Sequence, residues 1–261
     1  MIFGKGEHRR TKRISNENLP KSTEIAAFWQ GSYYFCLAYD RIKPSAVFDE
    51  FQNAASLHAD KLGVGFDDLI KKKAVWMLIR CRYDVFSYPS FEQPLNITTY
   101  PLKPKGIEFD REYEITDKSG NKLIKGSSMW CICNLETRKL MFGNEFTYNS
   151  EEYSDKRQYE GTLKKIPPII TDGYKSFRSR TYFTDLDHNG HVNNTRYLDF
   201  IMNALSEEGD FCVDYFEINY INEMKRDSEF EILYGKTENG YSLRCESGEK
   251  EIFRAVVGVK K

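Results

Sequence analysis

The sequence lacks both a long hydrophobic run and a net charge. Its uninterrupted apolar stretches, such as Ala74 to Ile79, are far shorter than the roughly 20 residues of a membrane-spanning helix. Lys and Arg residues (38) nearly balance Asp and Glu residues (39), which leaves a net charge of −1. We therefore expect neither a membrane nor nucleic acid as a partner. A composition that is 40% hydrophobic and 15% aromatic is typical of a globular protein.

The six cysteines lack the spacing of a zinc site or a disulfide framework. No CxxC pair occurs, and the residues are dispersed through the chain. Cys131 and Cys133 alternate with Ile132 in an apolar segment, which predicts two small buried side chains. The pattern favours a reducing, cytoplasmic location, and it implies no metal and no other cofactor.

Three signatures of common enzyme classes are also missing. The chain has no GxSxG elbow, no GxxxxGK[ST] phosphate loop and no GxGxxG turn. Serine hydrolase, P-loop and Rossmann interpretations therefore lose their main support.

The first residues of the sequence are basic. MIFGKGEHRRTKR carries five Lys or Arg residues against one Glu and has no apolar stretch of the kind found in a secretory signal. We expect residues 1–24 to form a flexible arm, either a solvated terminus or a contact for an acidic partner.

A long amphipathic helix is predicted from about Ser45 to Leu62. Apolar residues recur there at helical spacing, Ser45 is a suitable N-cap, and Gly63 can end the helix in a left-handed conformation. The hydrophobic period then changes to two, which predicts strands, with Ser119-Gly120 as a hairpin turn. The predicted strand segments are VWMLIRCRYDVF, LNITTYPL, IEFDREYEIT and KLIKGSSMWCICN.

The last third of the chain repeats this order. NNTRYLDFIMNALSEEG predicts a second helix, capped by Asn193 or Asn194 and ending near Gly209. Strand-like segments follow, with Ser247-Gly248 in the position of the first Ser-Gly turn. These segments are YFEINYI, SEFEILYGKT, YSLRCES and KEIFRAVVGV. We infer a tandem duplication of an α+β unit, in which a helix covers the apolar face of an antiparallel sheet.

The two units are separated by a charged segment with little periodicity. It contains Pro167-Pro168, which is typical of a linker. The sequence predicts four parts: an arm at 1–24, an N-terminal domain at 25–148, a linker at 149–172 and a C-terminal domain at 173–261.

The stretch TDLDHNGHVNN, residues 184–194, holds two aspartates, two histidines and three asparagines. Asp187, Asn189 and His191 alternate, so an extended backbone would project all three to one side. His191 is suited to carry a proton, a carboxylate can orient water, and Asn189 can donate and accept hydrogen bonds. The N–H groups at the start of the second helix could stabilise an oxyanion.

Two other interpretations fit the same stretch. Asp and Asn often form turns and caps through local hydrogen bonds, so composition alone favours a structural loop. A metal site built from Asp187, His188 and His191 is weaker, because this spacing is not that of the HExxH motif.

The segment DLDHNGHVNNTRYLDFI resembles the signature of the acyl-acyl-carrier-protein thioesterases. INYINEMKRDS (218–228) is similar to that family's second active-site strand, and residues 75–101 and 108–140 are similar to its N-terminal domain. The resemblance extends over most of the chain from about residue 25. It implies two tandem hot-dog domains, each a long helix wrapped by an antiparallel sheet.

The resemblance also implies roles for individual residues. Asp187, Asn189 and His191 match the family's Asp-x-Asn-x-His, and Glu223 matches its catalytic glutamate. The implied reaction is hydrolysis of a fatty acyl thioester on acyl carrier protein, with the active site in the C-terminal domain and much of the acyl pocket in the N-terminal one. Either carboxylate could be the base.

One departure concerns the residue after Glu223. Plant members have a cysteine there, whereas this chain has Met224, which cannot form a thiolate. This favours activated water over a covalent cysteine route. Lys71 to Lys73 and Lys225-Arg226 are either solvated faces or a dock for the carrier protein.

Two rival functions remain open from the sequence. An acyl-coenzyme A hydrolase would use the same residues, and a non-catalytic acyl-thioester regulator would bind without turnover, its arm from Lys5 to Arg13 contacting nucleic acid. Two hot-dog units can pair within one chain, so both a monomer and a homodimer are compatible with the sequence.

Overall fold

The computed structural model describes residues 25–30, 36–37, 41–90, 93–146, 153–168 and 173–260. The basic arm expected at 1–24 lies outside these residues. None of the helices in the described ranges has the length and apolar character needed to cross a membrane.

The described chain forms one large antiparallel sheet of 11 strands. In order across the sheet they run β1-β5-β6-β7-β4-β10-β13-β12-β11-β9, with β8 beside β7. Two short strands, β2 (Cys36–Leu37) and β3 (Arg41–Ile42), pair separately. The strands of the sheet are β1 (Ile25–Gln30), β4 (Ala74–Val85), β5 (Pro94–Pro101), β6 (Phe109–Asp117), β7 (Lys122–Asn134), β8 (Leu140–Met141), β9 (Lys175–Arg180), β10 (Cys212–Tyr220), β11 (Glu229–Thr237), β12 (Gly240–Ser247) and β13 (Lys250–Lys260).

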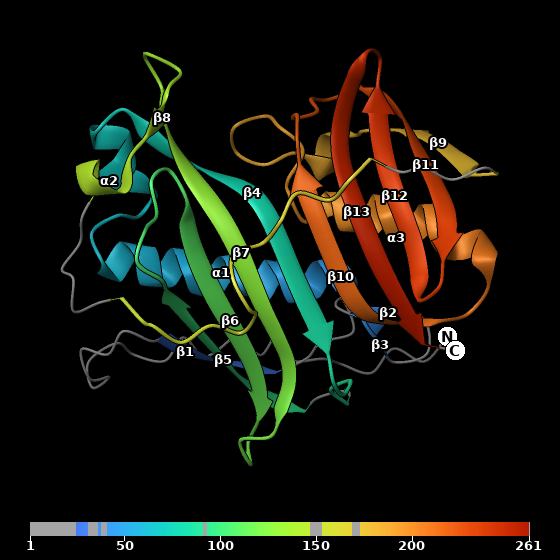
Figure 1. The fold of residues 1–261 in the computed structure, drawn as a ribbon, viewed down its shortest axis with the longest axis horizontal. Helices are drawn as coiled ribbons and strands as arrows, with labels where there is room; N and C mark the ends of the chain where they lie inside the picture. The colour runs from blue at the N-terminus through green and yellow to red at the C-terminus, as the bar shows by residue number, and fades with distance from the viewer. Residues whose placement is uncertain are drawn as a thin grey trace, which may run out of the picture.

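The strand order is mirrored about the central pair β4 and β10. In each half, the first strand of the large sheet in chain order lies at its edge, and the strand that follows the long helix lies at its centre. The two Ser-Gly turns join β6 to β7 and β12 to β13, and Gly120 and Gly248 have positive φ values of 82° and 60°. These observations confirm the tandem α+β arrangement, and Figure 1 shows the two halves side by side, each with its helix behind the strands.

Helix α1 (Pro44–Lys61) forms where the apolar spacing predicted it. Gly63 follows with a φ of 70°, as expected for the end of a helix. The predicted cap was wrong, because no side chain caps this helix and Pro44 occupies its first turn. The hydroxyl of Ser45 instead donates to Asp199 Oδ1 in the other half, at 2.6 Å.

Helix α3 (Arg196–Leu205) is shorter than expected and begins later. Neither Asn193 nor Asn194 is its N-cap, which is Thr195. A short helix that the sequence did not predict, α2 (Phe66–Lys71), precedes β4. Its six residues are too few for a helical period to stand out.

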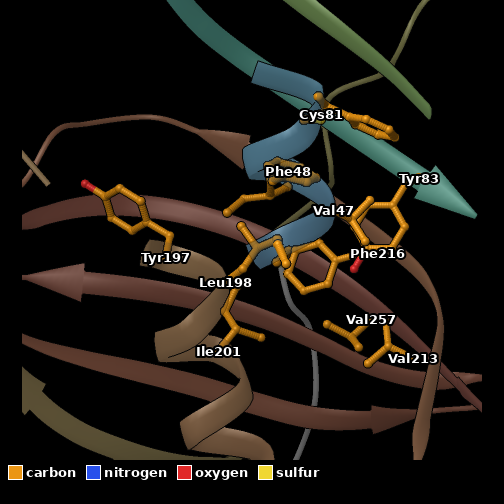
Figure 2. Close-up of a cluster of buried hydrophobic side chains, with 14 of the residues drawn as sticks. Val47, Phe48, Cys81, Tyr83, Tyr197, Leu198, Ile201, Val213, Phe216 and Val257 are labelled. Atoms are coloured by element: carbon orange, nitrogen blue, oxygen red, sulfur yellow. The ribbon is translucent and has the colours of Figure 1, made fainter. Parts of the chain in front are cut away.

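The core lies between the helices and the inner face of the sheet. Phe48 of α1 contacts the rings of Tyr83 on β4 and Phe216 on β10, which stack at 5.8 Å (Figure 2). The ring of Phe51 stacks on Tyr113 at 4.3 Å. Helix α1 thus packs against strands of both halves.

Residues 153–168 cross the face of the sheet opposite α1; we call this segment the strap (yellow in Figure 1). It docks on β6 through Asp110 and Glu112, which accept hydrogen bonds from Arg157 and from the Gln158 N–H. It reaches the second half where the Ile166 N–H donates to Asn219. Both faces of β6 are therefore covered, which explains its run of buried polar residues.

Candidate active site

The polar stretch forms a tight turn closed by backbone hydrogen bonds. The Asp187 N–H donates to His191 O at 2.8 Å, and the Gly190 N–H donates to Asp187 O at 3.1 Å. Gly190 has a φ of 77°, a conformation that costs a glycine little. The expectation that an extended backbone projects Asp187, Asn189 and His191 to one side was therefore wrong.

The carboxylate of Asp187 holds this turn together. Its Oδ1 accepts the N–H of Asn189 at 2.8 Å and the N–H of His191 at 3.2 Å. Such side-chain to backbone bonds define the loop and set the direction of the residues that follow. The structural interpretation thus applies to Asp187, whereas the reactive interpretation applies to the other polar residues of the loop.

His191 and Glu223 are brought together from distant segments. The ring Nδ1 of His191 lies 3.4 Å from Glu223 Oε2, and both side chains are accessible to solvent. A backbone bridge pairs His191 with Lys225, and the Val192 N–H donates to Met224 O at 2.9 Å. The segment after β10 therefore runs beside the loop and presents its carboxylate to the imidazole.

Asn189 lies at the exposed tip of the turn. Its amide can both donate and accept hydrogen bonds, so it can meet a carbonyl oxygen that approaches the loop. The donors expected at the helix start are in part already used. Asn193 accepts the Thr195 N–H through its side chain and the Arg196 N–H through its carbonyl. Those two groups do not form the expected oxyanion site.

Met224 points in the opposite direction from Glu223. Its side chain is buried in the core, whereas Glu223 beside it is exposed. Alternation along an extended segment accounts for this difference. The side chain at position 224 therefore does not lie with the polar groups of the loop, which agrees with a reaction that uses no nucleophile there.

Two neighbours of the loop carried no signal in the sequence. The ring of Phe66, on α2, contacts the ring of His188 edge-on at 4.9 Å. The hydroxyl of Tyr197 accepts the Met224 N–H at 3.1 Å. Helical spacing places Tyr197 on the apolar face of its helix, but it cannot reveal the partner of a hydroxyl.

The described residues offer little support for a metal or for a strongly basic dock. No group of three His, Cys, Asp or Glu side chains within the described ranges is arranged to hold a metal ion. Lys71, Lys73 and Arg226 each pair with a nearby carboxylate, at 3.6, 2.5 and 3.2 Å. Docking of a carrier protein on these cations stays a prediction.

Known proteins resemble this chain in sequence. A chloroplastic acyl-acyl-carrier-protein hydrolase of Cuphea viscosissima is 25% identical over 226 residues, covering 77% of this chain and 54% of that protein. A chloroplastic palmitoyl-acyl carrier protein thioesterase of Arabidopsis thaliana is 29% identical over 171 residues, covering 60% and 41%. The chain thus spans about half the length of the curated relatives it matches.

Solved structures share the fold. An acyl-ACP thioesterase from Bacteroides thetaiotaomicron superimposes with a TM-score of 0.82 at 19% identity, over 91% of this chain and 98% of that one. The 12:0-ACP thioesterase from Umbellularia californica gives 0.81 at 19% identity, over 92% and 98%. These likenesses confirm the hot-dog architecture expected from the sequence.

Family models divide the chain into the same two halves. The model of the acyl-ACP thioesterase N-terminal domain matches residues 28–145, and that of the C-terminal domain matches residues 171–253. Together they cover most of the sequence, including the loop, Glu223 and helices α1, α2 and α3. The chain therefore belongs to the acyl-ACP thioesterase family.

Proposed function

We propose that this protein hydrolyses the thioester of a fatty acyl group carried by acyl carrier protein, with His191 and Glu223 as the reacting pair. The observation that carries this proposal is the 3.4 Å separation between His191 Nδ1 and Glu223 Oε2. Family membership supplies the reaction class. Both side chains are accessible to solvent, so a thioester that is attached to a carrier protein can reach them.

Each residue has a distinct task in this proposal. Glu223 orients the imidazole of His191 through Nδ1 and stabilises the positive charge that the ring gains. The other ring nitrogen then takes a proton from a water molecule, which attacks the thioester carbonyl. Asn189 donates to the carbonyl oxygen as negative charge develops there. The intermediate then collapses to a carboxylic acid as its C–S bond breaks, and the His191 imidazolium returns the proton to the departing pantetheine sulfur.

The structure also suggests which carboxylate supports the base. Asp187 Oδ1 is already bound to two backbone N–H groups, whereas Glu223 faces the imidazole. We infer that Asp187 maintains the loop and that Glu223 assists proton transfer. Replacing Asp187 should therefore alter the loop as well as the rate.

Hydrolysis of acyl-coenzyme A is the second candidate. Both carriers present the same pantetheine arm and thioester, so the pair of His191 and Glu223 would serve either one. The names of the relatives favour the carrier protein. A regulator that binds acyl thioesters without turnover needs no paired imidazole and carboxylate, which makes that function less suitable.

The test is release of free fatty acid from acyl carrier proteins and acyl-coenzyme A of several chain lengths. We expect turnover by the parent protein and a loss of at least about 100-fold in kcat for His191→Ala and Glu223→Gln, the usual size of a general acid-base contribution. Glu249→Gln, in the exposed turn before β13, is the matched control. Binding without release by the parent would contradict the proposal.

A further inference from the structure

Tyr197 lies on the first turn of α3, beneath the segment that carries Glu223. Its side chain is 2% exposed and contacts the rings of Tyr220 and Phe253, each at 5.7 Å. Figure 2 shows Tyr197 at the margin of the apolar cluster, with its hydroxyl oxygen directed away from Leu198 and Ile201. Burial raises the pKa of this phenol, so the group stays neutral near pH 7.

The hydroxyl of Tyr197 holds one particular peptide unit. It accepts the N–H of Met224 at 3.1 Å, and that N–H belongs to the peptide that joins Glu223 to Met224. Because a peptide is planar, fixing its N–H also fixes rotation about the Cα–C bond of Glu223. The carbonyl of Met224 is held in turn by the Val192 N–H, next to His191.

A second tyrosine, Tyr220, binds the segment that follows His191. The Tyr220 hydroxyl donates to Asn194 O at 2.9 Å, in the segment that links the catalytic loop to α3. The rings of Tyr197 and Tyr220 contact each other edge-on. The two hydroxyls therefore tie the Glu223 segment and the His191 segment to one rigid aromatic pair.

We propose that Tyr197 is a positioning residue that aims the Glu223 carboxylate at His191 by holding the Met224 N–H. This inference rests on the proposed function for its effect on rate, although the geometry it predicts exists without substrate. Removing the hydroxyl leaves a buried N–H without its partner and releases the peptide that directs Glu223. The separation between the carboxylate and the imidazole then varies.

The experiment compares Tyr197→Phe with Tyr241→Phe. Tyr241 is also buried, and its hydroxyl bonds Glu208 at the other end of α3, so this control loses an equivalent group away from the site. For Tyr197→Phe we expect kcat to fall about tenfold, because the carboxylate of Glu223 is no longer aimed at the imidazole in the transition state, with KM changed less than twofold. Tyr241→Phe should leave kcat unchanged.

A second readout needs no turnover. In the parent protein, Glu223→Gln should shift the ¹⁵N resonance of the His191 ring, since the carboxylate lies beside it. In the Tyr197→Phe background this response should shrink markedly, whereas in the Tyr241→Phe background it should persist. A merely structural tyrosine would lower the melting temperature without removing the response.

The outcomes separate the two proposals. Equal kcat losses in both Tyr variants, or a full ¹⁵N response in the Tyr197→Phe background, would overturn the positioning role. If the parent protein releases no fatty acid, the hydrolysis proposal fails while the ¹⁵N response still decides the role of Tyr197. Tyr220→Phe should also lower kcat, and it provides a second variant if Tyr197→Phe folds poorly.

Discussion

The ring of Phe66 in the N-terminal half lies edge-on against the ring of His188 in the C-terminal half, with centroids 4.9 Å apart. This contact joins helix α2 to the turn that carries the proposed catalytic residues. Phe66 is 46% exposed, and His188 is exposed as well. The N-terminal half thus supports the loop directly.

Replacing Phe66 should therefore weaken catalysis without unfolding the protein. An aromatic pair contributes about 0.5–1.5 kcal/mol, so we expect Phe66→Ala to reduce kcat/KM between about twofold and tenfold. Ile70→Ala, one turn further along α2 and similarly exposed, should have less effect. Steady-state kinetics on one acyl thioester tests this, and equal effects of both substitutions would count against the contact.

Gly126 permits the close approach of α1 to β7. A methyl group at this position would lie 2.2 Å from the ring of Phe51 and 3.1 Å from the carbonyl of Arg82. We expect Gly126→Ala to lower the free energy of unfolding by about 1–3 kcal/mol, the usual cost of overpacking a core. Urea denaturation measures it. The double variant Gly126→Ala/Phe51→Leu should lose less unfolding free energy than the two single variants together. Strict additivity would contradict the steric explanation.

The contribution of Glu112 to the stability of the protein should fall as the pH rises from about 4.5 to about 7. Burial raises the pKa of Glu112 from 4.5 to about 7, despite hydrogen bonds from the Gln158 N–H and the Ser127 hydroxyl. Between these values the folded protein keeps a proton that the unfolded chain has lost, so the unfolding free energy decreases with pH, by on the order of a few kcal/mol.

Glu112→Gln removes this titration. Its unfolding free energy, minus that of the parent, should increase from pH 5 to pH 8 when both are measured in urea at each pH. Glu249→Gln, at an exposed turn, should show a constant difference. A constant difference for Glu112→Gln would show that the carboxyl is ionised throughout this range.

Arg82 should hold the strap against the sheet. Its guanidinium lies between the rings of Tyr159 on the strap and Tyr215 on β10, at 4.3 and 4.5 Å from their centroids. Such contacts contribute about 0.5–2 kcal/mol each. We expect Arg82→Met to increase the rate of tryptic cleavage within residues 153–168 several-fold. Arg178→Met, which loses only an exposed pair with Glu231, should not change that rate.

Local patterns were sufficient for most of the secondary structure. The eight predicted strands, α1 and both Ser-Gly turns form close to their expected positions, because apolar spacing and turn chemistry act over a few residues. Strand β9, Lys175–Arg180, was missed because an edge strand rich in Lys, Arg and Ser has no apolar alternation. The placement of the acyl chain in the N-terminal half stays a prediction.

The duplicated order of helix and strands could be predicted from the sequence alone, and residue type and resemblance pointed to four candidate polar residues. The separate roles proposed for these residues follow from the tertiary structure, because the decisive contacts join distant segments of the chain. His191 meets Glu223, and Tyr197 meets Met224. No short-range pattern encodes such contacts, since they arise only when strand pairing and core packing bring the segments together.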